Sequence, residues 1–421
     1  MNIHQEGCAL HQFWFGKRVV IGISGGIAAF RTLDLIRLLQ EEGAVVEVVV
    51  TPAALRFVTR LSLESLTGGR VHDELFALTR EGEMGHIRLA READLVLVVP
   101  ATADLLAKMV SGLANDLLTA LLLARGGRPV LVAPAMNDAM WNHPATQRNV
   151  TQLKEDGLYI APPVRGRLAC GSEGEGRLAP VEDILEQARR ILTPKPLRGW
   201  HLLVTAGPTI EELDPVRFLS NHSSGRMGVA MTQAALRAGA EVTLIHGPLA
   251  IPLPMGVQAV AVRSAQEMLE AACRAWPQCD GAILSAAVAD YRPLLRQEDK
   301  IRKNSGQQNI ELQLVTNLDI LATLVDLEAA RRSLGTEVKR RPVVGFAAET
   351  QDVLNRGREK FKRKGCDFLL VNDVTEPGCG FGAEENRVIV LGPGDQEQEW
   401  PKMHKETLAE YFMAFLMQSF V

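Results

Sequence analysis

The sequence predicts an α/β protein made of two Rossmann-like, doubly wound parallel-sheet domains joined by a short linker. Three observations predict this fold class. Short β-branched runs alternate with helical runs, the alternation restarts near residue 200, and a Pro-containing segment separates the two series. The same glycine-then-strand pattern occurs in both halves, as GAVVEVVVTP at 43–52 and GAEVTLIHGP at 239–248.

The first domain is predicted over residues 17–192, after an N-terminal extension of residues 1–16. A helix between two strands makes those strands parallel, because only a crossover connection returns the chain to the same edge. Residues 161–180 are rich in Gly and Pro and are expected to form a long loop. The regular elements expected here, in chain order, are a strand at 18–23, a turn at 24–26, a helix at 28–40, strands at 45–50, 94–100 and 128–134, and a helix at 181–192.

The second domain is predicted over residues 199–421, after a linker at 193–198 whose prolines mark the best domain boundary. It repeats the opening of the first domain and then continues with further strands. The elements expected here are a strand and turn at 201–208, a helix at 227–238, a strand within 239–248, and strands at 281–286, 342–347 and 367–371.

Composition excludes several classes of function. The chain of 421 residues has 46 basic and 50 acidic side chains, and aromatic residues make up only 5%. Neither the net charge of −4 nor the aromatic content favours nucleic acid or an anionic membrane. The six cysteines form no C-x-x-C pair, and the apolar stretches fall far short of the roughly 20 residues of a membrane span. We expect a cytoplasmic protein.

The string GISGG, residues 22–26, lies where the first strand turns into a helix. Such turns offer backbone N–H groups and a helix N-terminus to an anion. The next strand ends in Thr51, whereas an NAD site would carry an acid there, so a phosphate suits this turn better. Two alternatives remain: a plain tight turn, and a G-x-S-x-G nucleophile elbow that would make Ser24 a hydrolase nucleophile.

Three further residues of the first half are candidates for chemistry. His86 precedes a helical run and is either a base or a capping or core histidine. Asn137, in PAMNDAMW after a strand end, can bind a carboxylate through its amide or can cap a turn. Cys170, in a glycine-rich segment, is either an acid on a lid or a bystander.

The second half contains the most distinctive string, VTAGPTIEELDPVRFLSNHSSGRMG at 204–228, which combines a Gly-Pro turn, an arginine and a glycine-flanked helix start. These are features of an anion site. Asp290 ends a later strand and can bind a ribose or a metal. The charged run after it includes Lys300, and Lys360 and Lys364 share one helical face. A solvated charged face is the alternative for both lysine groups.

The blocks GISGGIAA, GHIRLA, PATADLLAKMVSGLANDLL, PAMNDAMW and LACGSEGEGRL occur in this order and resemble the flavin-dependent cysteine decarboxylases. The resemblance implies that His86 is the base, that Asn137 with Met136 binds the substrate, and that Cys170 is an acid on a flap. The residues that it places near FMN are Gly22, Ser24, Gly25, Thr51, Ala101, Thr102 and Ala103.

The strings of the second half resemble the phosphopantothenate–cysteine ligases, and together the halves resemble the bacterial bifunctional coenzyme A biosynthesis proteins. The resemblance implies that Arg217 and Asn221 flank an acyl-cytidylate and that Lys300 assists attack on it. The residues that it places around CTP are Ala286, Ala287, Asp290, Lys300, Leu318, Asp319, Ile320, Leu321, Phe346, Lys360 and Lys364.

Four positions depart from the family patterns. Asp104 stands where PATAN has Asn, and Ala107 stands where Gly usually precedes the lysine. Arg226 replaces the lysine of NHSSGKMG, which keeps the charge and changes its geometry. Leu318 replaces the proline of N-P-D, which alters the loop expected around the triphosphate.

The resemblance therefore implies an enzyme that ligates 4′-phosphopantothenate to L-cysteine with CTP and decarboxylates the product with FMN. Mg²⁺ is expected because triphosphate chemistry develops charge that a divalent cation neutralises, although the sequence indicates no metal ligands. Homo-oligomers through both halves are expected, and neither nucleic acid nor a membrane is expected as a partner. A regulatory flavoprotein without turnover and a Ser24 hydrolase remain as alternatives.

Overall fold

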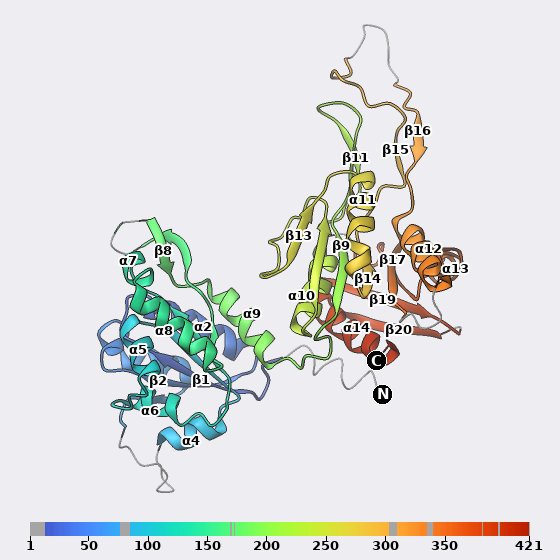
Figure 1. The fold of residues 1–421 in the computed structure, drawn as a ribbon. Helices are drawn as coiled ribbons and strands as arrows, with labels where there is room; N and C mark the ends of the chain where they lie inside the picture. Colours follow the sequence, from blue (N-terminus) through green and yellow to red (C-terminus); the bar gives the residue numbers. More distant parts are fainter. Residues whose placement is uncertain are drawn as a thin grey trace. The chain divides into compact units, whose positions relative to one another are not determined.

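The computed structural model of the chain describes residues 13–75, 85–168, 171, 173–302, 310–334, 340–380, 382–394 and 396–420. The chain divides into two compact units that meet between Thr193 and Pro194 (Figure 1). Trp14, in the predicted extension, is fully buried in the core of the first unit. No helix in the described part of the chain is both long and apolar enough to cross a membrane.

The first unit is built on a six-stranded parallel sheet with the order β3-β2-β1-β4-β5-β6. This is the Rossmann order, in which the strand order reverses beside the first strand. The prediction of a parallel-sheet domain is therefore confirmed. The strands are β1 (Arg18–Ile23), β2 (Val45–Val50), β3 (Val71–His72), β4 (Leu95–Ala101), β5 (Val130–Pro134) and β6 (Tyr159–Ile160).

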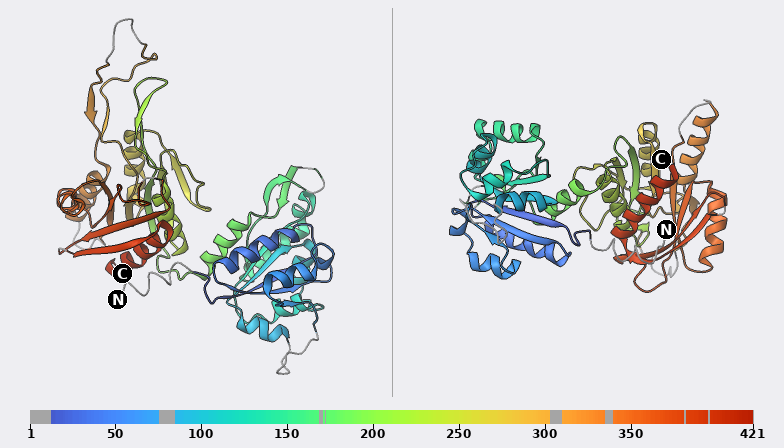
Figure 2. Two further views of the ribbon diagram at one scale, coloured as in Figure 1. Left: turned by 180° about the vertical axis from the view of Figure 1, so that it is seen from behind. Right: turned by 90° about the horizontal axis from the view of Figure 1, so that it is seen from below.

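Helices cover both faces of this sheet (Figure 2). Adjacent residues of β1 face opposite cores: Ile21 packs with α2, α3 and α9, and Val20 packs with α4, α5, α6 and α8. Strands buried on both faces explain the continuous apolar runs of the sequence. The helices are α2 (Ala29–Glu41), α3 (Arg60–Thr67), α4 (Gly85–Glu92), α5 (Ala103–Val110), α6 (Leu117–Leu123), α7 (Asp138–Trp141), α8 (Pro144–Glu155) and α9 (Val181–Leu192), with a 3₁₀ turn η1 (Ala54–Arg56).

The segment predicted as a long loop at 161–180 instead contains an antiparallel hairpin of β7 (Val164–Arg167) and β8 (Glu173–Arg177). The prediction was wrong because EGEGR has no apolar alternation to indicate a strand. Glycine serves here to bring two backbones close together: a Cβ on Gly176 would lie 2.3 Å from the Met136 carbonyl oxygen. The Met136 N–H donates to the Gly176 carbonyl at 2.9 Å, which docks β8 onto the PAMN segment.

The second unit repeats the same strand order and then extends it. Its eight-stranded sheet runs β13-β12-β9-β14-β17-β18-β19-β20, and the last two strands are antiparallel. The parallel part confirms the prediction, whereas the antiparallel edge was not predicted. The strands are β9 (His201–Ala206), β12 (Glu241–His246), β13 (Gln258–Ala261), β14 (Gly281–Leu284), β17 (Val343–Glu349), β18 (Phe368–Asp373), β19 (Glu385–Gly392) and β20 (Gln396–His404).

One face of this sheet packs on α10 and α14, and the other face packs mainly on α11, α12 and α13. Two antiparallel ribbons follow the carboxyl ends of β9 and β14 and project beyond the sheet (Figure 1). They are β10 (Ile210–Glu212) with β11 (Phe218–Ser220), and β15 (Tyr291–Pro293) with β16 (Leu314–Thr316). The helices are α10 (Arg226–Arg237), α11 (Ala265–Ala275), α12 (Ile320–Ser333), α13 (Val353–Lys364) and α14 (Lys405–Phe420), with a 3₁₀ turn η2 (Trp276–Gln278).

Candidate active sites

The carboxyl ends of β1, β2 and β4 are tied together by two hydroxyls. The Ser24 Oγ donates to the Pro100 carbonyl at 2.7 Å and accepts from the Thr102 N–H at 3.0 Å. The Thr51 Oγ1 donates to the Ile23 carbonyl at 3.2 Å. Both side chains are buried, and both hydroxyl protons are used inside the protein. These hydroxyls therefore shape the site rather than point into it, and a buried Ser24 that is 3% exposed is poorly placed to act as a nucleophile.

The turn that these hydroxyls support leads into the N-terminus of α2. The cap residue Ala28 has no side-chain oxygen, and the first turn of α2 carries no acidic residue. A Cβ on Gly25 would lie 2.5 Å from the Ala53 Cβ, so only glycine allows the two loops to approach this closely. An uncapped helix N-terminus with close backbone N–H groups fits a phosphate monoester such as that of FMN.

The segment after β4 lies beside this turn through the bond between Ser24 and Thr102. Thr102 caps α5 by accepting from the Leu105 N–H at 3.3 Å. Asp104, the first departure from the family pattern, lies on the outer face of α5 and pairs with Lys108 at 3.0 Å. Its side chain is 74% exposed, so the departure is accommodated by an ion pair one helical turn away.

His86 lies in α4, and its buried Nδ1 has no hydrogen-bond partner among the described residues. A buried polar atom without a partner is costly, and a catalytic role is one explanation for it. A cluster of charged and polar side chains around Glu47, which the sequence analysis missed, contacts α4 through Arg88. Glu47 of β2 accepts from Arg88 at 3.0 Å and contacts His72 Nε2 at 2.9 Å.

The environment of Glu47 is unusual for a glutamate on a central strand. Burial alone would raise the pKa of Glu47, but the hydrogen bonds and charges of His72 and Arg88 outweigh it and lower the pKa to about 2. The residue remains a carboxylate and anchors the helix that carries His86. An acid inside the apolar run VVEVVV was the signal that could have identified it.

The PAMN segment leads from β5 into α7. Asn137 caps α7, because its Oδ1 accepts from the Ala139 N–H at 2.9 Å, as the capping alternative anticipated. Met136 docks β8 beside this cap through its N–H bond to the Gly176 carbonyl. Cys170 lies outside the described residues, between the two strands of the hairpin. The structure thus brings Asn137, Met136 and the hairpin together.

In the second unit, the carboxyl ends of β9 and β14 meet the distinctive string of the sequence. The Asn221 amide donates to the Ala287 carbonyl at 3.0 Å and to the Val288 carbonyl at 3.2 Å. The Ala287 N–H donates to the Gly207 carbonyl at 2.9 Å. Asn221 and the predicted pair Ala286–Ala287 are therefore neighbours at this edge of the sheet.

The predicted CTP residues of the later segments also gather at this edge. The Asn317 amide donates to the Ala289 carbonyl at 2.8 Å, and its backbone N–H donates to the Asp290 carbonyl at 2.8 Å. Asp319 caps α12 by accepting from the Ala322 N–H at 3.1 Å. Leu318, between them, is 62% exposed, so the loop holds its place through its neighbours without the family's proline.

The two lysines of α13 contact acids on neighbouring elements. Lys360 Nζ donates to Glu349 at the end of β17 at 2.8 Å, and Lys364 forms an ion pair with Asp319. Burial lowers the pKa of Lys364, and the charge of Asp290 opposes this effect. Phe346 lies on β17, so the predicted residues on α12, α13 and β17 come together. Among the described residues, no group of three or more His, Cys, Asp or Glu side chains could hold a metal ion.

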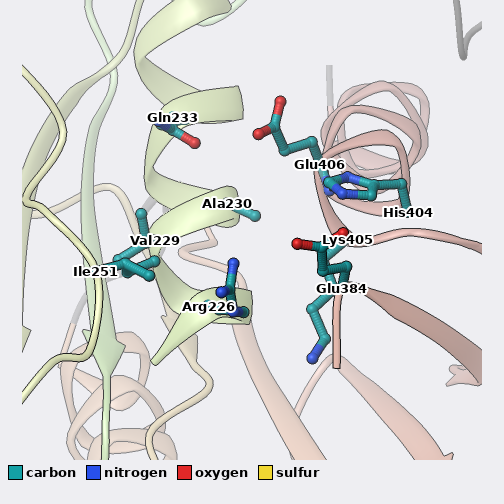
Figure 3. Close-up of a pocket in the computed structure, with 9 residues that line it drawn as sticks. All are labelled: Arg226, Val229, Ala230, Gln233, Ile251, Glu384, His404, Lys405 and Glu406. Atoms are coloured by element: carbon teal, nitrogen blue, oxygen red, sulfur yellow. The ribbon is translucent and has the colours of Figure 1, made fainter. Parts of the chain in front are cut away.

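Arg226, the third departure, lies away from these lysines at the start of α10. It lines a pocket between α10 and the junction of β20 with α14 (Figure 3). Lys405 faces the same pocket and donates to the Ala383 carbonyl at 2.5 Å. Burial and the nearby Arg226 charge lower the pKa of Lys405.

The segment that carries Lys300 is joined to the turn between β10 and β11. Arg217 pairs with Asp214 at 3.1 Å and also donates to the Ile301 carbonyl at 3.0 Å. Asp214 was not singled out from the sequence, because its partner at residue 301 is remote in the chain. The structure thus places Arg217 next to the segment of Lys300.

Comparisons with known proteins cover both units. Residues 14–193 match the Flavoprotein family, and residues 197–419 match the DNA/pantothenate metabolism flavoprotein C-terminal domain. The coenzyme A biosynthesis bifunctional protein CoaBC of Vibrio vulnificus is 44% identical over 90% of this chain and 92% of its own length. The CoaBC protein of Escherichia coli is 42% identical over 94% of this chain and 96% of its own length.

Solved structures match each unit separately. The C-terminal domain of a CoaBC protein has 33% sequence identity and a TM-score of 0.43, covering 53% of this chain and 97% of its own. The FMN binding protein AtHal3 has 34% identity and a TM-score of 0.37, covering 42% and 96%. The resemblance inferred from the motifs is confirmed by the full-length relatives. The chain belongs to the family of bifunctional coenzyme A biosynthesis proteins, flavoproteins that join a phosphopantothenoylcysteine decarboxylase to a phosphopantothenate–cysteine ligase.

Proposed function

We propose that residues 17–192 form the decarboxylase, that residues 199–421 form the ligase, and that the product of the second is the substrate of the first. The observation that supports this proposal is that several candidate residues of each unit, such as Ser24, Thr102 and Asn137 in the first and Asn221 and Ala287 in the second, lie at the carboxyl edge of its own sheet. Open α/β sheets bind their ligands at this edge. Two such edges in one chain support two reactions.

The ligase reaction begins with activation of 4′-phosphopantothenate. Its carboxylate attacks the α-phosphorus of CTP, pyrophosphate leaves, and an acyl-cytidylate forms. Lys360 and Lys364 supply positive charge for the triphosphate, and they exchange their contacts with Glu349 and Asp319 for phosphate oxygens. A divalent cation such as Mg²⁺, when bound with the triphosphate, would neutralise part of its charge.

The second half-reaction forms the amide. The amine of L-cysteine attacks the acyl carbon, the bond between this carbon and the phosphate oxygen breaks, and CMP leaves while the amine loses a proton. Lys300 stabilises the negative charge that develops on the leaving phosphate and the acyl oxygen. Arg217 and Asn221 orient the intermediate, and Ala286, Ala287, Asp290 and Phe346 line the nucleotide site.

The decarboxylase residues act on phosphopantothenoylcysteine. FMN, held by the α2 turn with the 22–25, 51 and 101–103 segments, supplies a two-electron acceptor and donor that no side chain can provide. Asn137 and Met136 hold the cysteine carboxyl end, and His86 accepts a proton from the substrate. Cys170 donates the proton that completes 4′-phosphopantetheine, since a thiol is a far stronger acid than a serine hydroxyl.

We also propose that the protein is a cytoplasmic homo-oligomer through both units. Exposed apolar side chains support this arrangement, because monomeric proteins rarely leave such groups clustered in solvent. On the two ribbons of the second unit they are Val216, Phe218, Tyr291, Leu294, Leu295, Leu312 and Leu314, and near the α2 turn they are Ile27, Phe30 and Phe57.

The test uses the full chain and two variants that separate the reactions. We expect a yellow protein that converts 4′-phosphopantothenate, L-cysteine and CTP to 4′-phosphopantetheine. His86→Asn should retain FMN and ligation but lose decarboxylation by about 10²–10⁴-fold, the usual contribution of a positioned base. Lys300→Gln should consume CTP once and accumulate acyl-cytidylate, with decarboxylation of added phosphopantothenoylcysteine intact.

Each alternative predicts a different outcome of the same assays. A yellow protein that is inert toward phosphopantothenoylcysteine would favour a regulatory flavoprotein. A colourless protein that reacts with a serine-directed phosphonate would favour the Ser24 hydrolase. Loss of both activities in either single variant would contradict the assignment of one reaction to each unit.

A further inference from the structure

Asp214 is a carboxylate enclosed by hydrogen-bond donors in the turn between β10 and β11. Its side chain is fully buried. One oxygen accepts from the Val216 N–H at 2.7 Å and the Arg217 N–H at 2.8 Å. The other accepts from the Arg217 guanidinium and from the Ile301 N–H, both at 3.1 Å. Three of these four bonds lie within the turn, and the fourth joins the turn to the remote residue Ile301.

The Ile301 residue is held on both of its backbone polar groups. Its N–H donates to Asp214, and its carbonyl accepts from Arg217 at 3.0 Å. A second bond fixes the same segment further upstream, because the Gln297 N–H donates to the Leu213 carbonyl at 2.9 Å. Lys300 lies between these two attachments, and its own side chain is exposed.

We propose that Asp214 is a positioning residue for Lys300, acting through the backbone of Ile301. The inference rests on the proposed role of Lys300 in amide formation. The Asp214–Arg217 pair fixes the peptide next to Lys300, so that the ammonium group meets the acyl-cytidylate in one place. Without the bonds of Asp214 and Arg217 to Ile301, the segment that carries Lys300 keeps only the attachment at Gln297.

The charge state of Asp214 agrees with this role. Burial alone would raise the pKa of Asp214, but the hydrogen bonds from Ile301, Val216 and Arg217 outweigh it and lower the pKa. The Asp214 side chain therefore stays a carboxylate throughout the neutral pH range. Asp214 contacts neither substrate nor nucleotide in this proposal, and both groups that it holds, Arg217 and the Lys300 segment, act on the acyl-cytidylate. Its loss should therefore slow amide formation and spare CTP activation.

The experiment compares the two half-reactions in full-length Asp214→Asn. Mass spectrometry of quenched single-turnover mixtures measures acyl-cytidylate and amide. We expect activation to stay within about threefold of the original rate and amide formation to fall about 10–100-fold, because a displacement of about 1 Å can cost a factor of 10². Hydrogen exchange should show faster exchange of the Ile301 amide.

A matched control is Asp373→Asn. Asp373, the last residue of β18, also accepts from a nearby backbone N–H, that of Thr375 at 2.8 Å, but this bond is local and joins no remote segment. We expect no separation of the half-reactions in this control. If Asp214→Asn fails to fold, Ile301→Pro removes the same N–H donor while leaving the buried turn intact, and it should give the same separation.

The outcomes distinguish this inference from the proposed function. If Lys300→Gln accumulates acyl-cytidylate but Asp214→Asn slows both half-reactions equally or neither, Asp214 is only a structural residue of the turn. If Lys300→Gln forms amide at the original rate, the role of Lys300 is wrong and the positioning role fails with it. Accumulation in both variants, with faster Ile301 exchange, supports the inference.

Discussion

The two units share one strand order but elaborate its carboxyl edge differently. In the first unit, the sheet stops at β6, and the described residues add one hairpin, β7 with β8, beside its carboxyl edge. In the second unit, the same order continues into two antiparallel strands, and two ribbons extend the edge outward. The common topology therefore fixes where a site lies, and the inserted segments determine what it can do.

Each unit also uses one buried carboxylate to hold a segment that carries a candidate catalytic side chain. Glu47 lies within a strand and holds α4, two residues beyond His86, through Arg88. Asp214 lies in a turn and holds the Lys300 segment through Ile301. The first arrangement fixes a rigid helix, whereas the second fixes an extended segment that stands away from the core. Variants of the two units should differ accordingly.

The largest effect is expected from Gly176→Ala in the hairpin. Gly176 has a φ of +152°, and an added Cβ would lie 2.3 Å from the Met136 carbonyl oxygen, so β8 must move off the PAMN segment. We expect decarboxylation to fall about 10²-fold, with FMN content and ligation unchanged. Decarboxylation assays with added phosphopantothenoylcysteine provide the measurement. Gly166→Ala is the control, because its Cβ meets only the flexible Arg177 side chain.

A smaller effect, on stability, is expected from Glu47→Gln. The pKa of Glu47 is lowered from 4.5 to about 2, so its contribution is complete above about pH 4.5 and is lost as the pH falls towards 2. The shift corresponds to at most roughly 3–4 kcal/mol. Glu47→Gln should lower the urea midpoint of the first unit at pH 7 and reduce its change between pH 4.5 and 2.

Hydrogen exchange in α4 would localise this loss to the helix that carries His86. Decarboxylation should fall together with α4 protection, and ligation should be unaffected. If α4 remains as protected in Glu47→Gln as in the original protein, Glu47 does not anchor the helix. The comparison of Glu47 with Asp214, as buried carboxylates that each hold a segment, would then fail for the first unit.

The parallel strands could be predicted because their signals are local. Glycines such as Gly43 and Gly239 stand between a helix and the apolar run that follows it, and the helices have clear periodicity. β19 and β20 were missed because they follow no strand–helix alternation, and β8 was missed because its glycines serve a backbone contact. The spacing of apolar residues indicates how a helix or strand is buried, but it does not indicate which other element it pairs with.

The site was predictable in its members but not in its connections. The motifs selected Asn221 and Ala287, which the structure places in contact, and Lys364 and Asp319, which form an ion pair. The roles of these residues stay predictions. The bond between Asp214 and Ile301 spans 87 residues, and no local pattern reports such a contact. Long-range polar contacts of this kind could therefore be identified only from the three-dimensional structure.

A still smaller effect, on nucleotide binding, is expected from Lys360→Gln in the second unit. A charge-assisted bond contributes about 1.5–3 kcal/mol, so loss of the ammonium should raise the KM for CTP at least about tenfold. Activation at saturating CTP should change less. Lys362→Gln on the same helix is the matched control, since it removes the same charge from an exposed position. Equal effects in both variants would indicate bulk electrostatics rather than a specific phosphate contact.

The smallest effect is expected from Asp104→Asn, which restores the residue of the family pattern near the turn proposed to hold FMN. Asp104 is mostly exposed and pairs with Lys108 across one turn of α5, and such pairs contribute about 0.3–0.5 kcal/mol. Its position in the first helical turn adds a similarly small interaction with the helix dipole. We therefore expect less than about 1 kcal/mol of destabilisation. If the Asp104 side chain points to solvent, as the ion pair indicates, the affinity for FMN should change less than about twofold, which fluorescence quenching measures. The control is Asp34→Asn on α2, which removes a comparable exposed pair with Arg31 and should behave alike. A tenfold change in affinity confined to Asp104→Asn would instead place this residue in contact with the flavin, and the edge of the first unit would then depend on a polar side chain outside its buried hydroxyls.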